Sequence, residues 1–381
     1  MRIAILTNAY PPRTRGGCGR IAFIYAELFK ARGHEVKVWG PRFWFYRSAK
    51  LPAPVRLFFH LRDLGSQSLT VKEIVDWQPD ALLTHNLTGC GFATPRTIKK
   101  FLDFGPSGVT SSGRRMRWVH MLHDVQLFEP SGQIIHEESW PAGRAAWRRF
   151  WAALRRRSLG EPDAVVSPTE WLMNEHAKRG FFRKTQKEVV PNPLGPAEVA
   201  VMKEWEKPGR RDRRAIAFIG RLDPDKGIDV LLDAWQRVRH VASKLIIVGE
   251  GSRQDYLTRL ADPKIIFKGR LENTQVLETL LGCGACVVPS LVLENQPTVI
   301  LEALACGCRV VVTDVGGASE TLARAGWIVK PASAQSLAAG LLEALKPLEN
   351  HTVESSRCEV LKRHEPEVCA SRLEGLLKSN L

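Results

Sequence analysis

The chain has 381 residues, of which 44% are hydrophobic and 25% are charged, and its formal net charge at pH 7 is +15. This composition is typical of a globular protein and excludes a disordered one, and the length suits two α/β domains. No apolar run is long enough to cross a bilayer, and the apolar part of the N-terminal segment MRIAILTNAYPP is too short for a signal peptide. We therefore expect a cytoplasmic protein.

Short apolar, β-branched runs alternate with helical patterns along the chain. The predicted strands of the first half lie at residues 2–6, 34–40, 80–85, 116–124, 163–168 and 187–192. Those of the second half lie at residues 215–221, 244–251, 265–269, 285–290, 309–314 and 326–330. Strands of this kind, separated by helices, indicate parallel sheets that helices cover on both faces. The sequence thus predicts an α/β fold with two Rossmann-like, doubly wound parallel-sheet domains.

The domain boundaries follow from a stretch without strand pattern. Residues 195–214 have a charged end that contains Gly and Pro, and we interpret them as the linker. This interpretation gives an N-terminal domain at 1–195 and a C-terminal domain at 196–360, with a final helix at 361–381 that packs back on the N-terminal domain. Because ligands of doubly wound folds bind at the carboxyl ends of the strands, we expect the two domains to face a cleft there.

The positive charge is concentrated in the first half. Residues 1–195 contain 30 Lys and Arg against 16 Asp and Glu, whereas the remainder contains 25 against 24. This asymmetry predicts an anionic partner, such as a membrane surface, nucleic acid or a polyanionic substrate. Segments 42–62 and 144–157 mix aromatic and basic residues, which suits an anionic membrane surface or a lipid-linked acceptor. The alternative is an ordinary surface helix whose aromatic stripe lies in the core.

A loop with two cations follows the predicted strand at 215–221. It reads GRLDPDKG and places Arg221 and Lys226 after Gly220. Arg can bind a phosphate through two hydrogen bonds and Lys as a point charge, so we predict phosphate binding here. The next strand also ends in a glycine turn, at Gly249, which marks the same sheet edge without identifying a ligand.

The stretch ENQPTVILEA contains two glutamates, Glu294 and Glu302, around a proline. Pro suits the first position of a helix, so we predict a helix from about Pro297 to Ala305. Its unpaired N–H groups, near Thr298 and Val299, would form an anion site.

Two cysteine pairs raise the question of a zinc site. They are Cys283 with Cys286 and Cys306 with Cys308. Their places in an apolar strand and at a helix end favour core packing over metal binding. We expect no structural zinc and, in a cytoplasmic protein, no disulfides.

Residues 215–330 closely resemble the nucleotide-sugar domain of glycosyltransferase family 4, whose members are retaining enzymes with the GT-B fold. The pieces GRLDPDKG, VGEGS and ENQPTVILEALACGCRVVVTDVGG carry this resemblance through their order and spacing. It implies that Glu302 accepts hydrogen bonds from the ribose hydroxyls, that Glu294 and the adjacent loop face the transferred sugar, and that Arg221 and Lys226 hold the diphosphate. The implied donor site comprises Gly16, Gly17, Gly220, Arg221, Lys226, Gly249, Glu294, Asn295, Gln296, Pro297, Thr298, Val299 and Glu302.

The first half resembles the acceptor domain of the same family more loosely. In NAYPPRTRGGCGR, Gly16 and Gly17 would let the backbone approach the donor phosphates or the acceptor. The sequence MLHD places His123 at the family's active-site histidine, although a strand histidine is more often structural. We do not expect His120 and His123 to share a metal, because residues three apart on a strand point to opposite faces.

The resemblance implies transfer of a sugar from a nucleoside diphosphate to a hydroxyl of a glycan or lipid-linked acceptor, in cell-surface polysaccharide or glycolipid synthesis. His123, Glu294, Arg221 and Lys226 are the candidate catalytic residues, and the two cations would stabilise the diphosphate leaving group. We expect no metal, no cofactor and no nucleic-acid partner, and a location in the cytoplasm or at the inner face of the membrane. The alternatives are a GT-B-fold epimerase and a basic nucleic-acid-binding protein, the latter disfavoured by the near-neutral second half.

Overall fold

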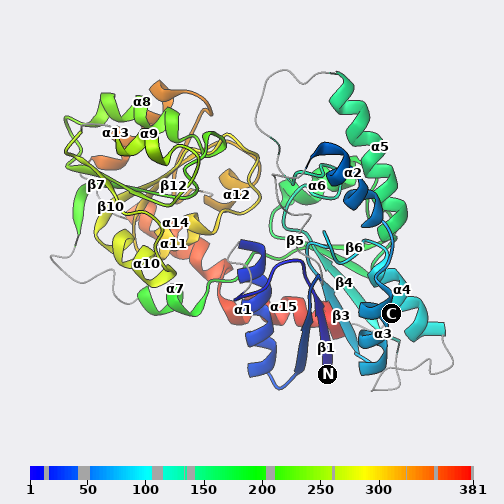
Figure 1. Ribbon diagram of the computed structural model, residues 1–381. Helices are drawn as coiled ribbons and strands as arrows, with labels where there is room; N and C mark the ends of the chain where they lie inside the picture. The colour runs from blue at the N-terminus through cyan, green and yellow to red at the C-terminus, as the bar shows by residue number, and fades with distance from the viewer. Residues whose placement is uncertain are drawn as a thin grey trace. The chain divides into compact units, whose positions relative to one another are not determined.

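The computed structural model describes residues 1–12, 17–41, 52–104, 115–132, 134, 142–202, 211–259, 262–322, 324–346 and 351–378. Contacts divide the chain into two compact units (Figure 1). The first comprises residues 1–134, 138–193 and 366–381, and the second comprises residues 135–137 and 194–365. Each unit contains one six-stranded sheet with parallel pairing throughout, which confirms the predicted pair of parallel-sheet domains.

The sheet of the first unit has the order β2-β1-β3-β4-β5-β6. Its strands are β1 (Arg2–Leu6), β2 (Glu35–Trp39), β3 (Ala81–Thr84), β4 (Arg117–Met121), β5 (Ala164–Ser167) and β6 (Gln186–Val189). Its helices are α1 (Gly17–Ala31), α2 (Ala53–Arg62), α3 (Ser68–Trp77), α4 (Thr94–Phe104), α5 (Ala142–Leu159), α6 (Glu170–Lys178) and α15 (Pro366–Lys378). The strand order reverses direction between β1 and β3, which makes the carboxyl ends of these two strands the expected ligand site of the unit.

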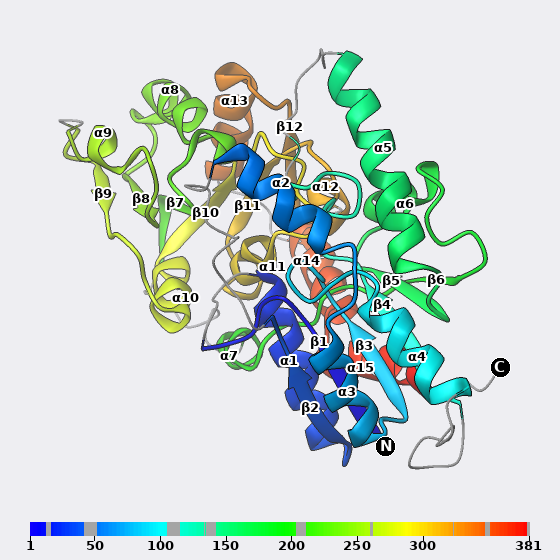
Figure 2. The same cartoon turned by 45° about the vertical axis from the view of Figure 1, so that its right-hand side comes forward.

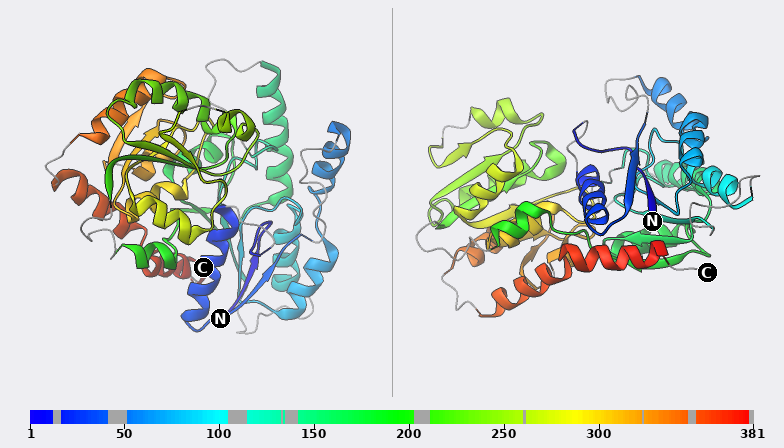
Figure 3. Two further views of the ribbon diagram at one scale, coloured as in Figure 1. Left: turned by 60° about the vertical axis from the view of Figure 1, so that its left-hand side comes forward. Right: turned by 90° about the horizontal axis from the view of Figure 1, so that it is seen from below.

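The last helix, α15, lies in the first unit although its sequence follows the second. It packs against α1, β3 and β4, and it lies along this sheet in the right-hand panel of Figure 3. Cys369, Leu373 and Leu377 join the core that Ile3 and Ile5 form, because the helix buries its apolar side on the sheet. The preceding part of the predicted terminal helix belongs instead to α14 (His351–Arg363), in the second unit.

The sheet of the second unit has the order β12-β11-β10-β7-β8-β9. Its strands are β7 (Asp212–Ile219), β8 (Lys244–Val248), β9 (Ile265–Phe267), β10 (Cys283–Val288), β11 (Arg309–Thr313) and β12 (Gly326–Val329). Its helices are α7 (Pro196–Val201), α8 (Ile228–Val238), α9 (Gln254–Thr258), α10 (Asn273–Leu281), α11 (Thr298–Ala305), α12 (Ala318–Leu322), α13 (Ala334–Leu345) and α14. This is the strand order of dinucleotide-binding Rossmann sheets, with the reversal between β7 and β10.

Alternating residues of the same strands build two cores in the second unit. On β10, Cys286 and Val288 pack with α10 and α11, whereas Ala285 and Val287 pack with α8 and α13. Figure 2 shows these two helix layers on opposite faces of the sheet. Burial of both strand faces explains why the strands read as continuous apolar runs.

The predicted linker at 195–214 is wrong at both ends. Residues 196–201 form α7, and β7 begins at Asp212. Pro196 occupies the first turn of α7, where its missing N–H is tolerated, and Val201 packs into the core of the unit. Residues 203–210 lie outside the described part of the chain.

Candidate functional site

Two loops meet where the strand order of the second unit reverses. One follows β7 and contains Arg221 and Lys226, and the other follows β10 and contains Glu294. The loops are joined through the carbonyl of Asp225, which accepts hydrogen bonds from the N–H groups of Leu291 at 2.9 Å and Val292 at 3.1 Å. The sequence-predicted donor residues of this half therefore gather at the edge where a Rossmann sheet binds its ligand.

Arg221 forms ion pairs within its own loop. Its guanidinium contacts the carboxylates of Asp223 and, at 2.5 Å, Asp225. Hydrogen bonds from the backbone N–H and hydroxyl of Ser252, together with the charge of Arg221, lower the pKa of Asp223. The sequence interpretation assigned Arg221 to phosphate and did not foresee these two carboxylates, which form an Asp-x-Asp sequence beside it.

Lys226 and Glu294 form an ion pair that spans the two loops. The hydroxyl of Ser290 also donates to Glu294 Oε1 at 3.0 Å, and the backbone carbonyl of Glu294 accepts from Gly317 N–H at 2.7 Å. About a fifth of each side chain of the pair is exposed. The sequence interpretation placed Lys226 and Glu294 on different parts of a ligand, whereas here each is the other's partner.

Helix α11 begins one residue later than predicted. Pro297 is its N-cap, with ψ of 115°, and Thr298 is the first helical residue. An extended N-cap is the usual geometry at a helix start, and Pro297 has no side-chain group to cap the N–H groups of the first turn. Those N–H groups remain suited to an anion. Next to the helix, Asn295 is buried and Gln296 is partly exposed.

Glu302 is only 6% exposed, in the second turn of α11. Burial and then the nearby Glu302 raise the pKa of the Cys306 thiol to about 12. Cys306 and Cys308 donate to the backbone carbonyls of Leu277 and Leu280. The paired cysteines of the sequence thus lie in the core as thiols.

The glycines of the predicted donor site allow close packing of the loops. A Cβ on Gly249, whose φ is 137°, would lie 1.8 Å from the carbonyl oxygen of Gly220. A Cβ on Gly227, whose φ is 71°, would lie 1.9 Å from the carbonyl oxygen of Pro289. A side chain at Gly227 would separate the loops that hold Lys226 and Glu294, and one at Gly249 would push the loop after β8 away from Gly220.

In the first unit, His123 lies just beyond β4, not on a strand. Its Nε2 is 2.7 Å from Nδ1 of His85, which directly follows β3, and the two rings stack with centroids 4.9 Å apart. His120 points elsewhere and bonds Thr84 Oγ1 at 2.8 Å. Gly17 begins α1, and Gly16 lies outside the described residues.

The paired histidines are held in the neutral form. Burial lowers the pKa of His123 to about 3. Burial, followed by the neighbours His123 and His120, lowers the pKa of His85 well below its usual range. Neutral imidazoles can donate and accept hydrogen bonds but bring no charge to a ligand.

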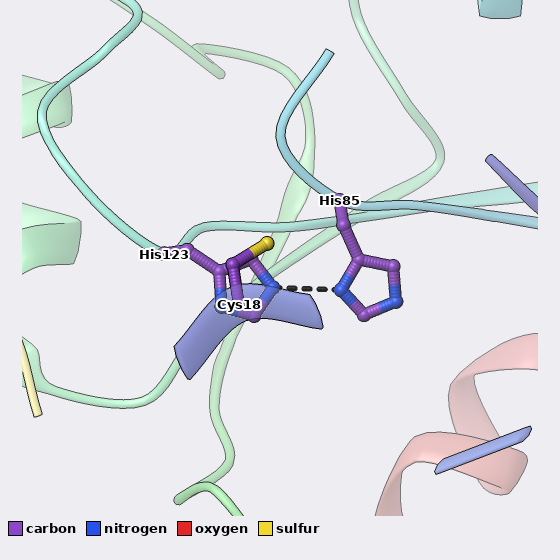
Figure 4. A group of neighbouring side chains, drawn as sticks. All are labelled: Cys18, His85 and His123. Atoms are coloured by element: carbon purple, nitrogen blue, oxygen red, sulfur yellow. Dashed lines mark hydrogen bonds between the residues drawn. The ribbon is translucent and has the colours of Figure 1, made fainter. Parts of the chain in front are cut away.

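Sequence reasoning missed His85 and Cys18. The side chain of Cys18, from the first turn of α1, lies beside the two histidines in Figure 4. The available signal was positional: His85 and His123 lie at the carboxyl ends of two predicted strands, and neighbouring parallel strands end at one edge.

The aromatic and basic segments of the first unit divide between core and surface. On α5, Trp151 is fully buried, whereas Trp147 and Phe150 are 43% and 54% exposed. On α2, Phe58 is 61% exposed. The two helices are neighbours, since the rings of His60 and Trp151 lie 5.8 Å apart. Residues 42–51 of the first predicted segment lie outside the described part of the chain.

None of the described helices combines the length and the apolar character that crossing a membrane requires.

Comparison with known proteins gives two family matches. Residues 15–197 match the model described as Glycosyltransferase Family 4, and residues 213–347 match that of Glycosyl transferases group 1. An uncharacterized glycosyltransferase of Methanocaldococcus jannaschii is 31% identical over 96% of this chain and 94% of its own. The putative teichuronic acid biosynthesis glycosyltransferase TuaC of Bacillus subtilis is 27% identical over 77% of this chain and 68% of its own.

A solved structure shows the same fold over the full length. The Anabaena protein HepE, crystallised with UDP, superposes with a TM-score of 0.65 at 17% identity and covers 100% of both chains. The two sheet domains are therefore those of the GT-B fold. The comparisons lend no support to the epimerase alternative.

Proposed function

Because the chain belongs to glycosyltransferase family 4, we propose that it transfers a sugar from a nucleoside diphosphate donor to a hydroxyl of a glycan or lipid-linked acceptor, in the synthesis of a cell-surface polysaccharide or glycolipid. The observation that carries this proposal is the Lys226–Glu294 pair at the reversal of the Rossmann sheet. The name of the Bacillus relative and the UDP in the HepE structure support the acceptor class and the donor class.

The ion pairs of this site suggest how the donor binds. The diphosphate competes with Glu294 for Lys226, and with Asp223 and Asp225 for Arg221, because phosphate and carboxylate are ligands of the same cations. Glu294, once released, can accept a hydrogen bond from a sugar hydroxyl. One ligand thereby replaces the partners of both Lys226 and Glu294. The lysine gains the opposite charge of the diphosphate, and the glutamate gains a hydrogen bond from the sugar.

The same cations assist the chemical step. As the bond to the anomeric carbon breaks, negative charge grows on the diphosphate, and Lys226, Arg221 and the N–H groups at the start of α11 would stabilise it. These groups supply the positive charge that a divalent ion would otherwise bring, so we propose metal-independent transfer. Retention of the anomeric configuration is part of the proposal through family membership.

Thermal unfolding with a panel of UDP-, GDP- and ADP-sugars tests the donor. One nucleotide class should raise the melting temperature, because a ligand that binds only the folded chain stabilises it. Lys226→Ala should lose most of that increase, and Lys346→Ala, which removes an exposed lysine paired with Glu343, should keep it. The absence of any shift with every nucleotide would refute donor binding, and NMR of the product's anomeric proton decides between retention and inversion.

For the acceptor side, we propose peripheral contact with an anionic membrane through α2 and α5. The exposed apolar side chains are Phe58 and Leu61 on α2 and Trp147 and Phe150 on α5, and the two helices are neighbours. Together with the exposed Arg149 on α5, they give the pattern of an interfacial helix surface. This surface would bring the active unit to a lipid-linked acceptor.

Sedimentation with vesicles that contain phosphatidylglycerol tests this contact. The wild-type chain should co-sediment, and Phe58→Ser with Trp147→Ser should reduce the bound fraction severalfold. Tyr256→Ser, which removes an exposed aromatic ring of the second unit, is the matched control and should change little. If the wild-type chain stays in the supernatant, the membrane contact is wrong.

A further inference from the structure

Three potential metal ligands converge at the carboxyl edge of the first sheet (Figure 4). Cys18 comes from the first turn of α1, His85 follows β3 and His123 follows β4. One sulfur and one nitrogen from each histidine all lie within 4.8 Å of one another. The three residues are distant in sequence, and the strand order of the sheet brings them together.

The elements that present these residues are fixed in place. The loops after β1 and β3 are joined by the hydrogen bond from Asn8 N–H to the carbonyl of Asn86, at 2.8 Å. Gly19, next to Cys18, packs so closely that a Cβ there would lie 3.0 Å from the backbone of Ala9. The first turn of α1 is therefore held against the end of β1, and the cluster is a preformed arrangement.

The histidine pair has the hydrogen-bonding freedom that metal binding needs. One hydrogen lies between His85 Nδ1 and His123 Nε2, which are 2.7 Å apart. The other nitrogen of His85, Nε2, is buried and has no hydrogen-bond partner. The neutral ring of His85 can therefore carry its hydrogen on Nε2, so that its Nδ1 is left to bind a metal. This change breaks no hydrogen bond at His85 Nε2.

A thiolate and two imidazoles are a ligand set that zinc prefers. Tetrahedral coordination places such ligand atoms about 3.3–3.7 Å apart, given metal–ligand bonds of about 2.0–2.3 Å. Coordination would therefore move the two nitrogens, now 2.7 Å apart, away from each other, through rotation of Cys18 and His123, which are both partly exposed. Three protein ligands leave the fourth position to water, as in an open zinc site.

We propose that Cys18, His85 and His123 bind a Zn²⁺ ion, and that the bound ion inhibits sugar transfer by holding His123 away from the substrate. Binding exchanges the thiol proton of Cys18 for a Zn–S bond and releases that proton to solvent, while both imidazoles bind as neutral ligands. The inhibitory part rests on the proposed function, and the binding part does not.

Titration of the full-length chain, first stripped of metal with EDTA, tests the site by spectroscopy. Co²⁺, a probe for zinc sites, should bind with one equivalent per chain and give a near-ultraviolet thiolate-to-metal band, which Zn²⁺ then removes by displacement. Cys18→Ser should abolish the band, and His85→Ala should weaken binding about tenfold or more. Cys358→Ser, which changes an exposed cysteine of the second unit, should leave both unchanged. A band that survives in Cys18→Ser would overturn the proposal.

The effect on transfer is measured separately, as the rate with Zn²⁺ relative to the same variant's rate without it. Wild-type transfer should fall as the site fills, and Cys18→Ser should need about tenfold more Zn²⁺ for the same fall. Cobalt binding without inhibition would refute the role given to the bound ion. A chain that shows the cobalt band but transfers no sugar would refute the proposed function and leave the metal site standing.

Discussion

The two sheets present contrasting chemistry at the points where their strand orders reverse. In the second unit, the loops after β7 and β10 hold ion pairs that are partly exposed, between Lys226 and Glu294 and between Arg221 and its two aspartates. In the first unit, the loop after β3, at the reversal, and the loop after the next strand, β4, hold two stacked neutral histidines, of which His85 is fully buried. Similar sheet topology therefore supports paired charges in one unit and a neutral histidine pair in the other.

The contrast follows from solvation. An ion pair that solvent partly reaches is less costly to open than a fully buried one, so a charged ligand can replace its partners. A buried imidazolium would be strongly disfavoured, so His85 and His123 remain neutral. The second unit thus suits the diphosphate of a donor, and the first suits groups that offer hydroxyls.

The largest effect should come from separating the loops of the second unit. Gly227→Ala places a Cβ against the Pro289 carbonyl at a positive φ, and we expect it to lower the free energy of unfolding by about 3 kcal/mol or more. Gly269→Ala is the matched control, since its φ of 61° is similar and no atom lies within 4 Å of the added Cβ. Its cost should be about 1 kcal/mol, from backbone strain alone. Urea denaturation of both variants measures the difference, and equal costs would show that the close contact is unimportant.

Removing one charge of the second site should affect catalysis more than folding. Lys226→Ala should lower kcat/KM by about 10²-fold, because the leaving diphosphate loses a cation. Its effect on stability should be smaller, about 1–2 kcal/mol, because a fifth of each side chain in the pair with Glu294 remains exposed. Steady-state kinetics and urea denaturation measure the two effects, with Lys346→Ala as the control. An unchanged kcat/KM would remove Lys226 from the proposed site.

Sequence reasoning located the central strands because both of their faces are buried. Each of the twelve strands in the described part of the chain overlaps a predicted one, and the motifs follow the strands β7, β8 and β10 as expected. What it could not find were side-chain partners that depend on strand order. Lys226 and Glu294 are 68 positions apart, and they meet only because β7 and β10 are neighbours in the sheet.

The same limit explains the missed residues of the first unit. In the sequence, the histidine nearest to His123 is His120, but its partner in the structure is His85, 38 positions away. The motif carries no information on that pairing, because it depends on adjacency of β3 and β4. The predicted end of the linker was wrong for another reason. The charged residues there form the start of β7, whose first residues are partly or fully exposed and whose following residues are apolar and buried.

A charged cluster lies at the amino end of the first sheet, opposite the carboxyl end that holds the neutral histidine pair. Glu374 on α15 bonds Arg32 and His34, near the amino end of β2, and Lys378 one turn along its own helix. Burial alone would raise the pKa of Glu374, but hydrogen bonds from Lys378, Arg32 and His34 lower it to about 2. Its ionised form is therefore stabilised by folding.

Glu374→Gln should lower the free energy of unfolding by about 1–2 kcal/mol at neutral pH, a value reduced for solvent screening of the exposed Lys378. Because the pKa is depressed in the folded chain, this stabilisation is complete above the ordinary glutamate pKa of about 4.3 and is lost as the pH falls towards 2. Urea denaturation at several pH values should show the two chains converging in acid. Glu367→Gln, which removes an exposed partner of Arg32, is the control with a smaller effect. A difference that grows in acid would contradict the assignment.

The smallest expected effect is an absence of titration at the uncharged site. The ring resonances of His85 and His123 should not move between about pH 5 and 8 in NMR spectra of the metal-free chain, because burial keeps their pKa values below that interval. The same rings in the urea-unfolded chain should titrate near 6.5, which controls for assignment and sensitivity. Titration of either ring near 6.5 in the folded chain would mean that water and charge reach this site too. The two reversal points would then differ in their residues but not in their electrostatics, and the division between a charged donor site and a neutral one would fail.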